Sequence, residues 1–592
     1  FDRLITSTEM ERVRVVMLYG SQTGTAEEVT SNLVMQSRGS LFKCTACALD
    51  DYLVKDLVNE EMVVFVCSTT GQGEPPDNMK RFWKFIMRKN LPVTCLSGLK
   101  FGVLGLGDSS YAKYNFIAKK LFRRLQNLGG EILVPLGLAD DQHEWGCDAV
   151  VDEWSRGLWQ KLISIYPIKD GVRSAVVYSL DWPLVTVFKV TMNEMHMEAQ
   201  KEQQQQAKPN HLEFSKKNPY LAALTGNQRV TATEHFQSLV LDIQNRDVIY
   251  SLYILFQDTR LISLDISAVV DKMRYEPGDV VMVQPRNLPH NVNALLGKTN
   301  DDDDSTTSLP KQATTLREIA TNYLDFMSKE KLVELGQPEG TDERYSYANR
   351  PRRTILEVLQ DFHLTASKIS LERIFDIFPP IQPRAFSIAS SPTRHRGKLQ
   401  ILVAVVRYKT RLQLPRQGVC STWLASLQPN DRVPVWLKRG GIRFPAKQHC
   451  ILIGPGTGIA PFRSAAHERT SNGNAGRCTT VFFGCRKSSS DFYFRDEWED
   501  LDVDLHVACS RDQEDKIYVQ HRIKEQGEKI WRLVSDENAS VFVAGNSKSM
   551  PDDVKSTFLE IFRVHGAMTS QEADDYCRTM QSVKRYQQET WS

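Results

Sequence analysis

Three short loops rich in glycine and hydroxyl side chains each follow an apolar, strand-like run in residues 1–165. A loop between a strand and a helix presents backbone N–H groups and hydroxyls to a phosphate. Loops that leave the carboxyl ends of neighbouring parallel strands meet at one edge, where such sheets bind ligands. The three loops therefore predict one shared site, and they are Ser21-Gln22-Thr23-Gly24-Thr25-Ala26, Ser68-Thr69-Thr70-Gly71-Gln72-Gly73 and Leu106-Gly107-Asp108-Ser109-Ser110-Tyr111.

The chemistry of these loops favours flavin mononucleotide (FMN). The first loop lacks the lysine of a nucleoside-triphosphate P-loop, and taken alone an ordinary helix cap explains it equally well. Together the loops supply contacts for a phosphate monoester, a ring edge and a ring face, and Tyr111 can stack on a flavin ring. Gly102, Gly105 and Gly107 also suggest a dinucleotide fingerprint, but their spacing does not fit one.

Two later glycine turns predict sites for larger cofactors. Gly418–Trp423 (GVCSTW) enters a helical pattern and aims N–H groups at a pyrophosphate, and Pro455–Phe462 (PGTGIAPF) forms a dinucleotide cradle after the strand-like Ile451–Gly454. Further on, Arg511 and Lys516 and the hydroxyls of Ser510 and Tyr518 suit a dianionic 2′-phosphate. No acidic residue for a bare ribose stands there, so the pattern favours NADPH over NADH.

Composition limits the class of protein. The 592 residues are 41% hydrophobic and 25% charged, which suits about three or four globular domains. A net charge of +2 gives no sign of nucleic-acid binding. Eleven scattered cysteines favour reduced thiols, and no apolar run approaches the roughly 18 residues of a membrane span. We expect a cytoplasmic protein with no membrane anchor, no nucleic-acid partner and no metal site.

Periodicity divides the chain. Short apolar strands alternating with helices predict a doubly wound parallel sheet over residues 11–167. A polar, glutamine-rich stretch predicts a linker over residues 168–228. Strand-like segments fill residues 229–445, and strands alternate with helices again over residues 446–592.

Three cofactor sites in the order FMN, FAD, NADPH resemble the diflavin reductase family, over nearly the whole chain. The resemblance implies a flavodoxin-like FMN domain, a ferredoxin-reductase-type FAD β-barrel with a helical connecting insert at about 285–350, and a Rossmann-like NADPH domain. It points to the cytosolic branch that serves iron–sulfur assembly rather than to the microsomal reductases. The motifs that carry it are STTGQGEPPDNMKRFW, LGLGDSSYAKYNF, NRPRRTILEVL, QPRAFSIASS, KIYVQHR and ETWS.

The resemblance also assigns roles to single residues. Arg384 meets the FAD pyrophosphate, and Phe386, in place of the family's Tyr, covers the flavin ring. Ser387, Glu589 and Trp591 are implied as catalytic: Ser387 lies near the hydride-accepting nitrogen, Glu589 orients the nicotinamide or handles its protons, and Trp591 stacks on FAD and swings aside.

The predicted cofactor contacts form three sets. For FMN they are Ser21, Gln22, Thr23, Gly24, Thr25, Ala26, Ser68, Thr69, Thr70, Gly71, Leu106, Gly107, Asp108, Ser109, Ser110, Tyr111, Ala112, Lys113, Tyr114, Asn115 and Asp141. For FAD they are Arg352, Arg384, Ala385, Phe386, Ser387, Gly418, Val419, Cys420, Ser421 and Trp591. For NADPH they are Thr457, Ser510, Arg511, Lys516, Ile517, Tyr518, Val519, Gln520 and Asp553.

An electron relay is the function that the resemblance implies. NADPH gives hydride to FAD, FAD passes electrons singly to FMN, and FMN reduces a one-electron protein acceptor, which we expect to be an anamorsin-type iron–sulfur protein. Two alternatives stay open: a reductase for a heme monooxygenase or synthase, and a scaffold that relays poorly. Acidic residues in the FMN loops are a hypothetical docking face for the acceptor, and they are Glu74, Asp77, Asp108, Asp140, Asp141 and Glu144.

The chain departs from the family pattern at several places. Thr70 stands where some relatives carry a second stacking aromatic, and Ala544 stands where several carry a cysteine that helps hydride transfer. The connecting insert is short, so we expect one or two of its helices to be missing. Phe236–Ile243 resembles Phe256–Ile266, which indicates an extra hairpin or a duplication.

Overall fold

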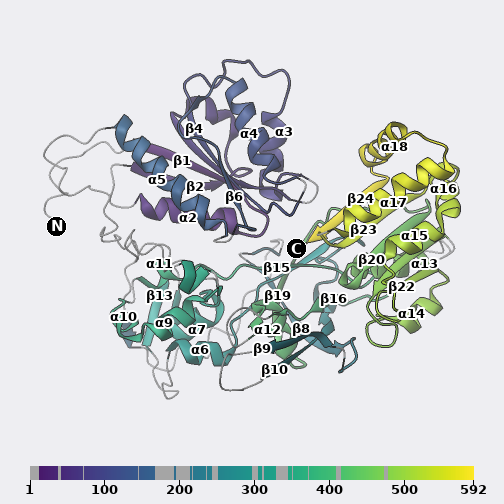
Figure 1. The fold of residues 1–592 in the computed structure, drawn as a ribbon. Helices are drawn as coiled ribbons and strands as arrows, with labels where there is room; N and C mark the ends of the chain where they lie inside the picture. Colours follow the sequence, from purple (N-terminus) through teal and green to yellow (C-terminus); the bar gives the residue numbers. More distant parts are fainter. Residues whose placement is uncertain are drawn as a thin grey trace, which may run out of the picture. The chain divides into compact units, whose positions relative to one another are not determined.

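Figure 1 draws this computed structural model as a ribbon coloured along the sequence. Its described residues form two compact units. The first unit comprises residues 1–194, 297–319 and 324–382, and the second comprises residues 195–296, 320–323 and 383–592. The structure describes residues 13–37, 42–70, 73–111, 113–143, 146–166, 192–194, 214–216, 218–234, 236–242, 251–296, 305–309, 312–328, 345–349, 351–370, 373–408, 415–471, 478–547 and 549–591.

A parallel sheet of order β2-β1-β3-β4-β5 organises the first unit, with β6 also paired to β4. This is the flavodoxin-like order, and it confirms the predicted doubly wound fold. The fifth position is divided, because β5 and β6 are separate short strands that both pair with β4. The strands are β1 (Val13–Gly20), β2 (Phe42–Ala48), β3 (Met62–Ser68), β4 (Lys100–Gly107), β5 (Glu131–Ile132) and β6 (Gly137–Asp140).

Both faces of this sheet are buried under helices, which explains why its strands are apolar throughout. Alternate residues of β3 face opposite cores: Val63 and Phe65 pack with α3 and α4, whereas Val64 and Val66 pack with α2 and α5. The helices are α2 (Thr25–Gln36), α3 (Lys80–Ile86), α4 (Phe116–Asn127) and α5 (Asp148–Ile165).

The described residues of 192–194 and 305–377 form short strands and helices. The strands β7, β13 and β14 form a three-stranded antiparallel sheet. Among the described residues, short helices continue to Ile377, beyond the expected end of the insert at about 350. These elements are β7 (Met192–Glu194), β13 (Ser305–Leu309), β14 (Gln312–Thr315), α7 (Leu316–Asn322), α9 (Ile355–Asp361), α10 (His363–Ala366) and α11 (Ile374–Ile377).

Six antiparallel strands form the barrel of the second unit, in the order β15-β12-β19-β8-β11-β16. A bridge between Ile388 and Ile401 joins the end of β15 to β16 and closes the sheet. The helices α6 (Pro289–Leu296) and α12 (Val419–Ser426) accompany it. The strands are β8 (Tyr220–Arg229), β11 (Thr259–Asp265), β12 (Val280–Val283), β15 (Arg384–Ser387), β16 (Lys398–Ala404) and β19 (Arg432–Lys438).

The structure corrects one expected boundary and resolves the repeat. β8 begins at Tyr220, inside the segment predicted as linker, so the barrel starts before residue 229. Its central Thr-Gly-Asn interrupts the apolar alternation, which hid the strand from the sequence pattern. The first copy of the repeat is β9 (Phe236–Asp242), which forms a separate hairpin with β10 (Ser251–Phe256), whereas the second copy is β11 of the barrel.

A second parallel sheet, of order β22-β21-β20-β23-β24, follows the barrel and has the Rossmann arrangement around a central first strand. We call residues 446–592, which contain it, the C-terminal lobe. Its strands are β20 (Cys450–Pro455), β21 (Thr479–Cys485), β22 (Asp504–Cys509), β23 (Ser540–Asn546) and β24 (Tyr586–Trp591). Its helices are α13 (Ala460–Ser471), α14 (Arg495–Asp500), α15 (Val519–Glu525), α16 (Gly527–Ser535), α17 (Met550–His565) and α18 (Ser570–Ser582).

Two expectations from composition can be compared with the structure. All eleven cysteines are described, and none of them forms a disulfide bond. None of the helices in the described ranges combines the length and the apolar character that a bilayer crossing requires.

Candidate cofactor sites

The first loop lies between β1 and α2 and is organised by Ser21. Ser21 Oγ accepts hydrogen bonds from the N–H groups of Gly24 (3.0 Å) and Ala26 (3.2 Å). Gly24 has φ 106°, in the left-handed region that glycine tolerates best. The Ser21 N–H is itself held by Asn78 Oδ1 at 2.8 Å. The loop is thus a tight turn at a helix N-terminus, as a phosphate site requires.

Asn78 is a supporting residue that our sequence reading did not single out. It lies in the PPDNM part of a quoted motif and contacts the phosphate loop across the sheet edge. Asp77 beside it exchanges two hydrogen bonds with Gln22, both of 3.0 Å. The proline pair that fixes this turn was the available signal, because a rigid turn next to a loop positions its side chains.

The second and third loops meet the start of α4. Thr69 Oγ1 accepts from the Ile117 N–H at 3.2 Å, which ties the second loop to that helix. Thr70 and Glu74 exchange backbone hydrogen bonds of 2.9 and 2.8 Å and close a small hairpin. The structure therefore brings the loops of β3 and β4 together, as predicted.

Asp140 organises the third loop. Its Oδ1 accepts from the N–H groups of Ser109 (2.8 Å) and Gln142 (3.0 Å). Burial raises the pKa of Asp140, but these hydrogen bonds outweigh that effect and hold the pKa below its usual range. The neighbouring Asp141 contributes a backbone bond, from its N–H to Gly107 O at 2.9 Å, and leaves its side chain exposed.

Asn115 fits a ligand-binding role better than a purely structural one. It is fully buried, has φ 50°, and its Nδ2 donates to Ala139 O at 2.9 Å. Its Oδ1 has no hydrogen-bond partner among the described residues. An added Cβ at Gly105 or Gly107 would lie 2.7 or 2.8 Å from that oxygen. Glycine at these two positions therefore leaves room for the Asn115 side chain. A buried acceptor without a partner is costly, and a bound ribityl phosphate would supply the missing donors.

Tyr114 and Lys119 lie beside Asn115, after the third loop. Tyr114 Oη donates to Leu138 O at 2.8 Å, and burial raises the Tyr114 pKa. Lys119 Nζ donates to Tyr114 O at 3.0 Å and lies 4.8 Å from the tyrosine ring centroid. Tyr111, the ring predicted to stack on the flavin, is half-buried. Four named loop residues lie outside the described residues: Gly71, Gln72, Ala112 and Glu144.

The predicted FAD residues divide between two elements of the barrel. On β15, Arg384 and Ala385 are exposed while Phe386 and Ser387 are half-buried, and Ser387 pairs with Val280 of β12. Gly418 caps α12, where Ser421 Oγ accepts from the Val406 N–H at 3.0 Å.

Thr422 is a second buried polar group that fits a ligand. Its Oγ1, in the first turn of α12, has no hydrogen-bond partner among the described residues. A pyrophosphate at this helix N-terminus would complete it. Arg352, the other predicted FAD contact, belongs to the first unit, has φ 56° and exposes its side chain.

The predicted NADPH cradle depends on a close backbone contact. An added Cβ at Gly458 would lie 2.1 Å from Ala544 O, so only glycine allows η8 (Gly456–Ile459) to pack against the end of β23. Thr457 lies in this turn, directly after β20 and before α13. Ala544, the residue noted for replacing a cysteine, is fully buried.

A cluster of cations lies at the ends of β21 and β22. Ser510 N–H donates to Cys485 O at 3.0 Å and Arg511 N–H donates to Arg486 O at 2.8 Å. Burial lowers the pKa of Arg486, and the charge of Arg511 lowers it further. Because the two positive charges repel each other, a dianionic ligand between them would be stabilised. Our sequence analysis did not name Arg486 as a site residue. Its place at the end of the FFGCR strand was the available signal.

The remaining predicted NADPH residues surround α15. Lys516 and Tyr518 are exposed, whereas Val519 is buried in the core and Ile517 packs against it. Gln520 is half-buried. Asp553 is exposed on α17. The two core residues therefore position the segment rather than present side chains to a ligand.

The end of the chain forms β24 at the edge of the lobe sheet. Glu589 pairs with Ala544 of β23, and its Oε1 accepts from the Gly441 N–H of the barrel at 3.4 Å. Trp591 pairs with Asn546, accepts from the Ser547 N–H at 2.9 Å through its backbone, and is 36% exposed. An exposed indole at a strand end suits a movable stacking residue.

Comparison with known proteins agrees with this order of sites. Residues 17–154 match the flavodoxin family, residues 307–423 the FAD binding domain, and residues 452–556 the oxidoreductase NAD-binding domain. NADPH-dependent diflavin oxidoreductase 1 of Xenopus laevis is 42% identical, covering 98% of this chain and 100% of the relative. Those of Bos taurus (41%; 98% and 100%) and Arabidopsis thaliana (32%; 98% and 99%) are also similar.

This chain belongs to the NADPH-dependent diflavin oxidoreductases. It is an oxidoreductase whose flavodoxin domain binds FMN, whose FAD-binding domain binds FAD and whose NAD-binding domain binds NADPH. Its partner is an electron-acceptor protein. When bound, the cofactors supply hydride and single-electron chemistry, and the protein supplies position and electrostatics.

Asn115→Gly tests the FMN site. Glycine keeps the left-handed backbone and removes the buried amide, so we expect FMN affinity to fall about 10-fold, the equivalent of one or two hydrogen bonds. Titration of apoprotein with FMN, followed by flavin fluorescence, measures this. The matched control is Asn430→Gly, at an exposed asparagine of the barrel with φ 77°. Equal FMN affinity in both variants would contradict the assignment.

Gly458→Ala tests the NADPH cradle. The new methyl group collides with Ala544 O, so the loop must shift, and we expect NADP⁺ affinity to fall about 10-fold or more while both flavins stay bound. Calorimetric titration with NADP⁺ measures the affinity. Gly157→Ala in α5 is the control, because an added Cβ there has no atom within 4 Å. Unchanged NADP⁺ binding in Gly458→Ala would exclude this loop from the site.

Proposed function

We propose that this chain reduces an anamorsin-type iron–sulfur protein and acts in the cytoplasm, in iron–sulfur cluster assembly. The observation that carries the proposal is the full-length similarity to the diflavin oxidoreductases above, together with motifs of the cytosolic branch such as KIYVQHR and ETWS. Two flavins suit such an acceptor, because hydride carries two electrons whereas an iron–sulfur or heme centre accepts one.

We further propose which parts of the chain do this work. Residues 11–167 form the FMN domain, the barrel runs from Tyr220 to about residue 445, and the C-terminal lobe, residues 446–592, forms the NADPH domain. Ser387, Glu589 and Trp591 act at the hydride-transfer end. Support comes from the sheets that hold these residues and from the loop glycines that shape the cradles.

The acidic residues at the FMN loops differ in what they can offer a partner. Asp77 and Asp140 are engaged within their loops, Asp77 with Gln22 and Lys80, and Asp140 with two backbone N–H groups. Asp141 exposes its side chain at the same edge of the sheet. We therefore assign the docking charge to Asp141 rather than to Asp140.

Asp141→Lys tests that docking face. We expect acceptor reduction to slow several-fold at low salt and its salt dependence to flatten, because rim charges act mainly on the association rate. The matched control is Glu131→Lys, the same charge reversal on β5, which pairs with the start of β4 and so lies at the opposite edge of the sheet. Stopped-flow reduction of the acceptor over a salt series measures both. Equal behaviour of the two variants would exclude this face.

Acceptor identity is tested by offering purified acceptors to flavin-loaded protein with NADPH, without oxygen. We expect an anamorsin-type protein to lose its iron–sulfur absorbance faster than a cytochrome P450 is reduced. Preference for the heme protein would overturn the proposal in favour of a heme-enzyme reductase. Bound flavins without reduction of either acceptor, or of cytochrome c, would favour the scaffold.

A further inference from the structure

The barrel and the C-terminal lobe share an apolar core. Ala389 and Leu402 of the barrel are buried with Phe462 and Phe542 of the lobe. Apolar contact is not directional, so it holds two surfaces together without fixing how they are turned. Hydride transfer needs the reacting atoms about 3–3.5 Å apart, and an error of about 1 Å can cost 100-fold in rate. Directional polar contacts must therefore fix the orientation of the lobe on the barrel at this interface, which we call the joint.

Arg463 of α13 crosses the joint. Its Nη1 donates to Ala389 O at 2.8 Å and to Gln400 Oε1 at 3.0 Å, both in the barrel. Its Nε and Nη2 donate to the two carboxylate oxygens of Glu497 at 2.6 and 2.9 Å. The residue is only 2% exposed. One planar guanidinium thus connects β16 and the segment after β15 with two lobe helices through fixed angles.

Glu497 strengthens this arrangement. Burial raises the pKa of Glu497, but hydrogen bonds from His467 and Arg463 and their charges outweigh it and hold the pKa at about 2. The carboxylate is therefore ionised at neutral pH and keeps Arg463 oriented towards the barrel. Because the pair is charge-assisted and bidentate, it resists rotation.

The same face of α13 follows the segment after β15. Ser464 Oγ donates to Ser390 O at 2.6 Å, next to the Ala389 carbonyl that Arg463 contacts. Glu468, one turn along, accepts from Ser391 Oγ at 2.6 Å and Thr393 Oγ1 at 2.7 Å. Arg463, Ser464 and Glu468 thus contact barrel residues 389–393 in the same order, which fixes the register between the two segments.

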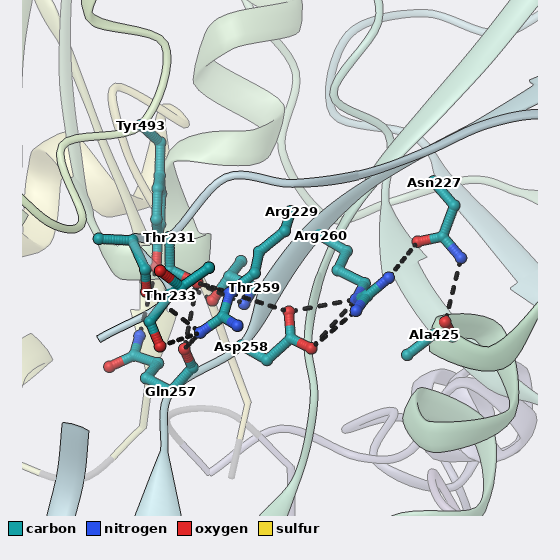
Figure 2. Close-up of polar contacts among 11 residues, drawn as sticks. Asn227, Arg229, Thr231, Thr233, Gln257, Asp258, Thr259, Arg260, Ala425 and Tyr493 are labelled. Carbon is teal, nitrogen blue, oxygen red and sulfur yellow. Dashed lines mark hydrogen bonds and ion pairs between the residues drawn. The ribbon is translucent and has the colours of Figure 1, made fainter. Parts of the chain in front are cut away.

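A second group of polar contacts joins the two parts elsewhere (Figure 2). Tyr493 of the lobe donates from Oη to Thr259 Oγ1 of β11 at 3.1 Å and accepts from Gln257 Nε2 at 3.3 Å. Gln257 Oε1 also accepts from Arg486 Nη1 at 2.6 Å, beside Arg511. This contact limits tilting of the lobe, but it lies on β11 rather than on the flavin strand β15.

We propose that Arg463 is a positioning residue for hydride transfer, which sets the register of the nicotinamide cradle against the flavin strand. Ala389 is two residues from Ser387 on one side, and Arg463 is six residues from Thr457 on the other. Arg463 thus links two segments that lie close in sequence to the predicted cofactor residues. The inference concerns the NADPH end of the relay and does not depend on which acceptor protein is reduced.

Arg463→Lys in the full-length, flavin-loaded protein tests this role. Lysine keeps the charge but cannot bridge Ala389, Gln400 and Glu497 with one planar fork. We expect the fast phase of flavin reduction by NADPH to slow about 10-fold or more, with a larger isotope effect from deuterated NADPH. Calorimetric affinity for 2′,5′-ADP, which lacks the nicotinamide, should stay within about 2-fold, because the adenosine half binds within the lobe.

Arg469→Lys is the matched control. Arg469 lies on the same helix, is 5% exposed, and donates to Thr479 Oγ1 and to the carbonyls of Pro445, Gln448 and Cys478. It makes as many hydrogen bonds as Arg463 but reaches neither β16 nor the segment after β15. We expect the two variants to lose similar thermal stability, while only Arg463→Lys slows hydride transfer.

Equal transfer rates and isotope effects in the two lysine variants would overturn the proposal, as would a loss of 2′,5′-ADP affinity that accounts for the slower reduction. Should Arg463→Lys fail to fold, Ser464→Ala removes one bond of the same register at less cost. We expect it to slow transfer about 3-fold with unchanged 2′,5′-ADP affinity. A rate equal to that of the unchanged protein would count against the proposal.

Discussion

Close backbone approach is the constraint on which the cofactor loops depend. At Gly458 the helical turn of the lobe packs so near Ala544 O that no side chain fits, and at Gly105 and Gly107 the space is filled by Asn115. Both contacts occur where parallel strands end, so backbone N–H groups converge there instead of side chains. In both nucleotide-binding folds of this chain, glycine therefore allows the close packing that shapes the loop, at unrelated positions in the sequence.

Much of this arrangement was predictable, because apolar strands followed by glycine and hydroxyl residues leave a strong local pattern. The apolar runs that precede the three FMN loops form β1, β3 and β4, as their pattern predicts. Asn115 was named from its motif, although its unusual backbone and unpaired oxygen follow only from the fold.

Other features could not be read in advance, because they depend on pairing between distant segments. β8 has an interrupted pattern and becomes a strand through its partners β11 and β19. Asn78 supports the phosphate loop from 57 residues away, and Arg463 finds its partners at Ala389 and Gln400. A buried arginine in a helix looks like a misplaced surface charge until its acceptors are known.

The order of strands in the barrel has a consequence for synthesis. β8 and β12 both pair with β19, and β12 pairs with β15, which follows it by about 100 residues of chain. The ribosome therefore completes the FMN domain long before the barrel can close, since β19 emerges more than 200 residues after β8 begins. Domains made first fold first. The half-made barrel, with its unpaired strand edges, is the stage at which a nascent chain most needs protection from aggregation.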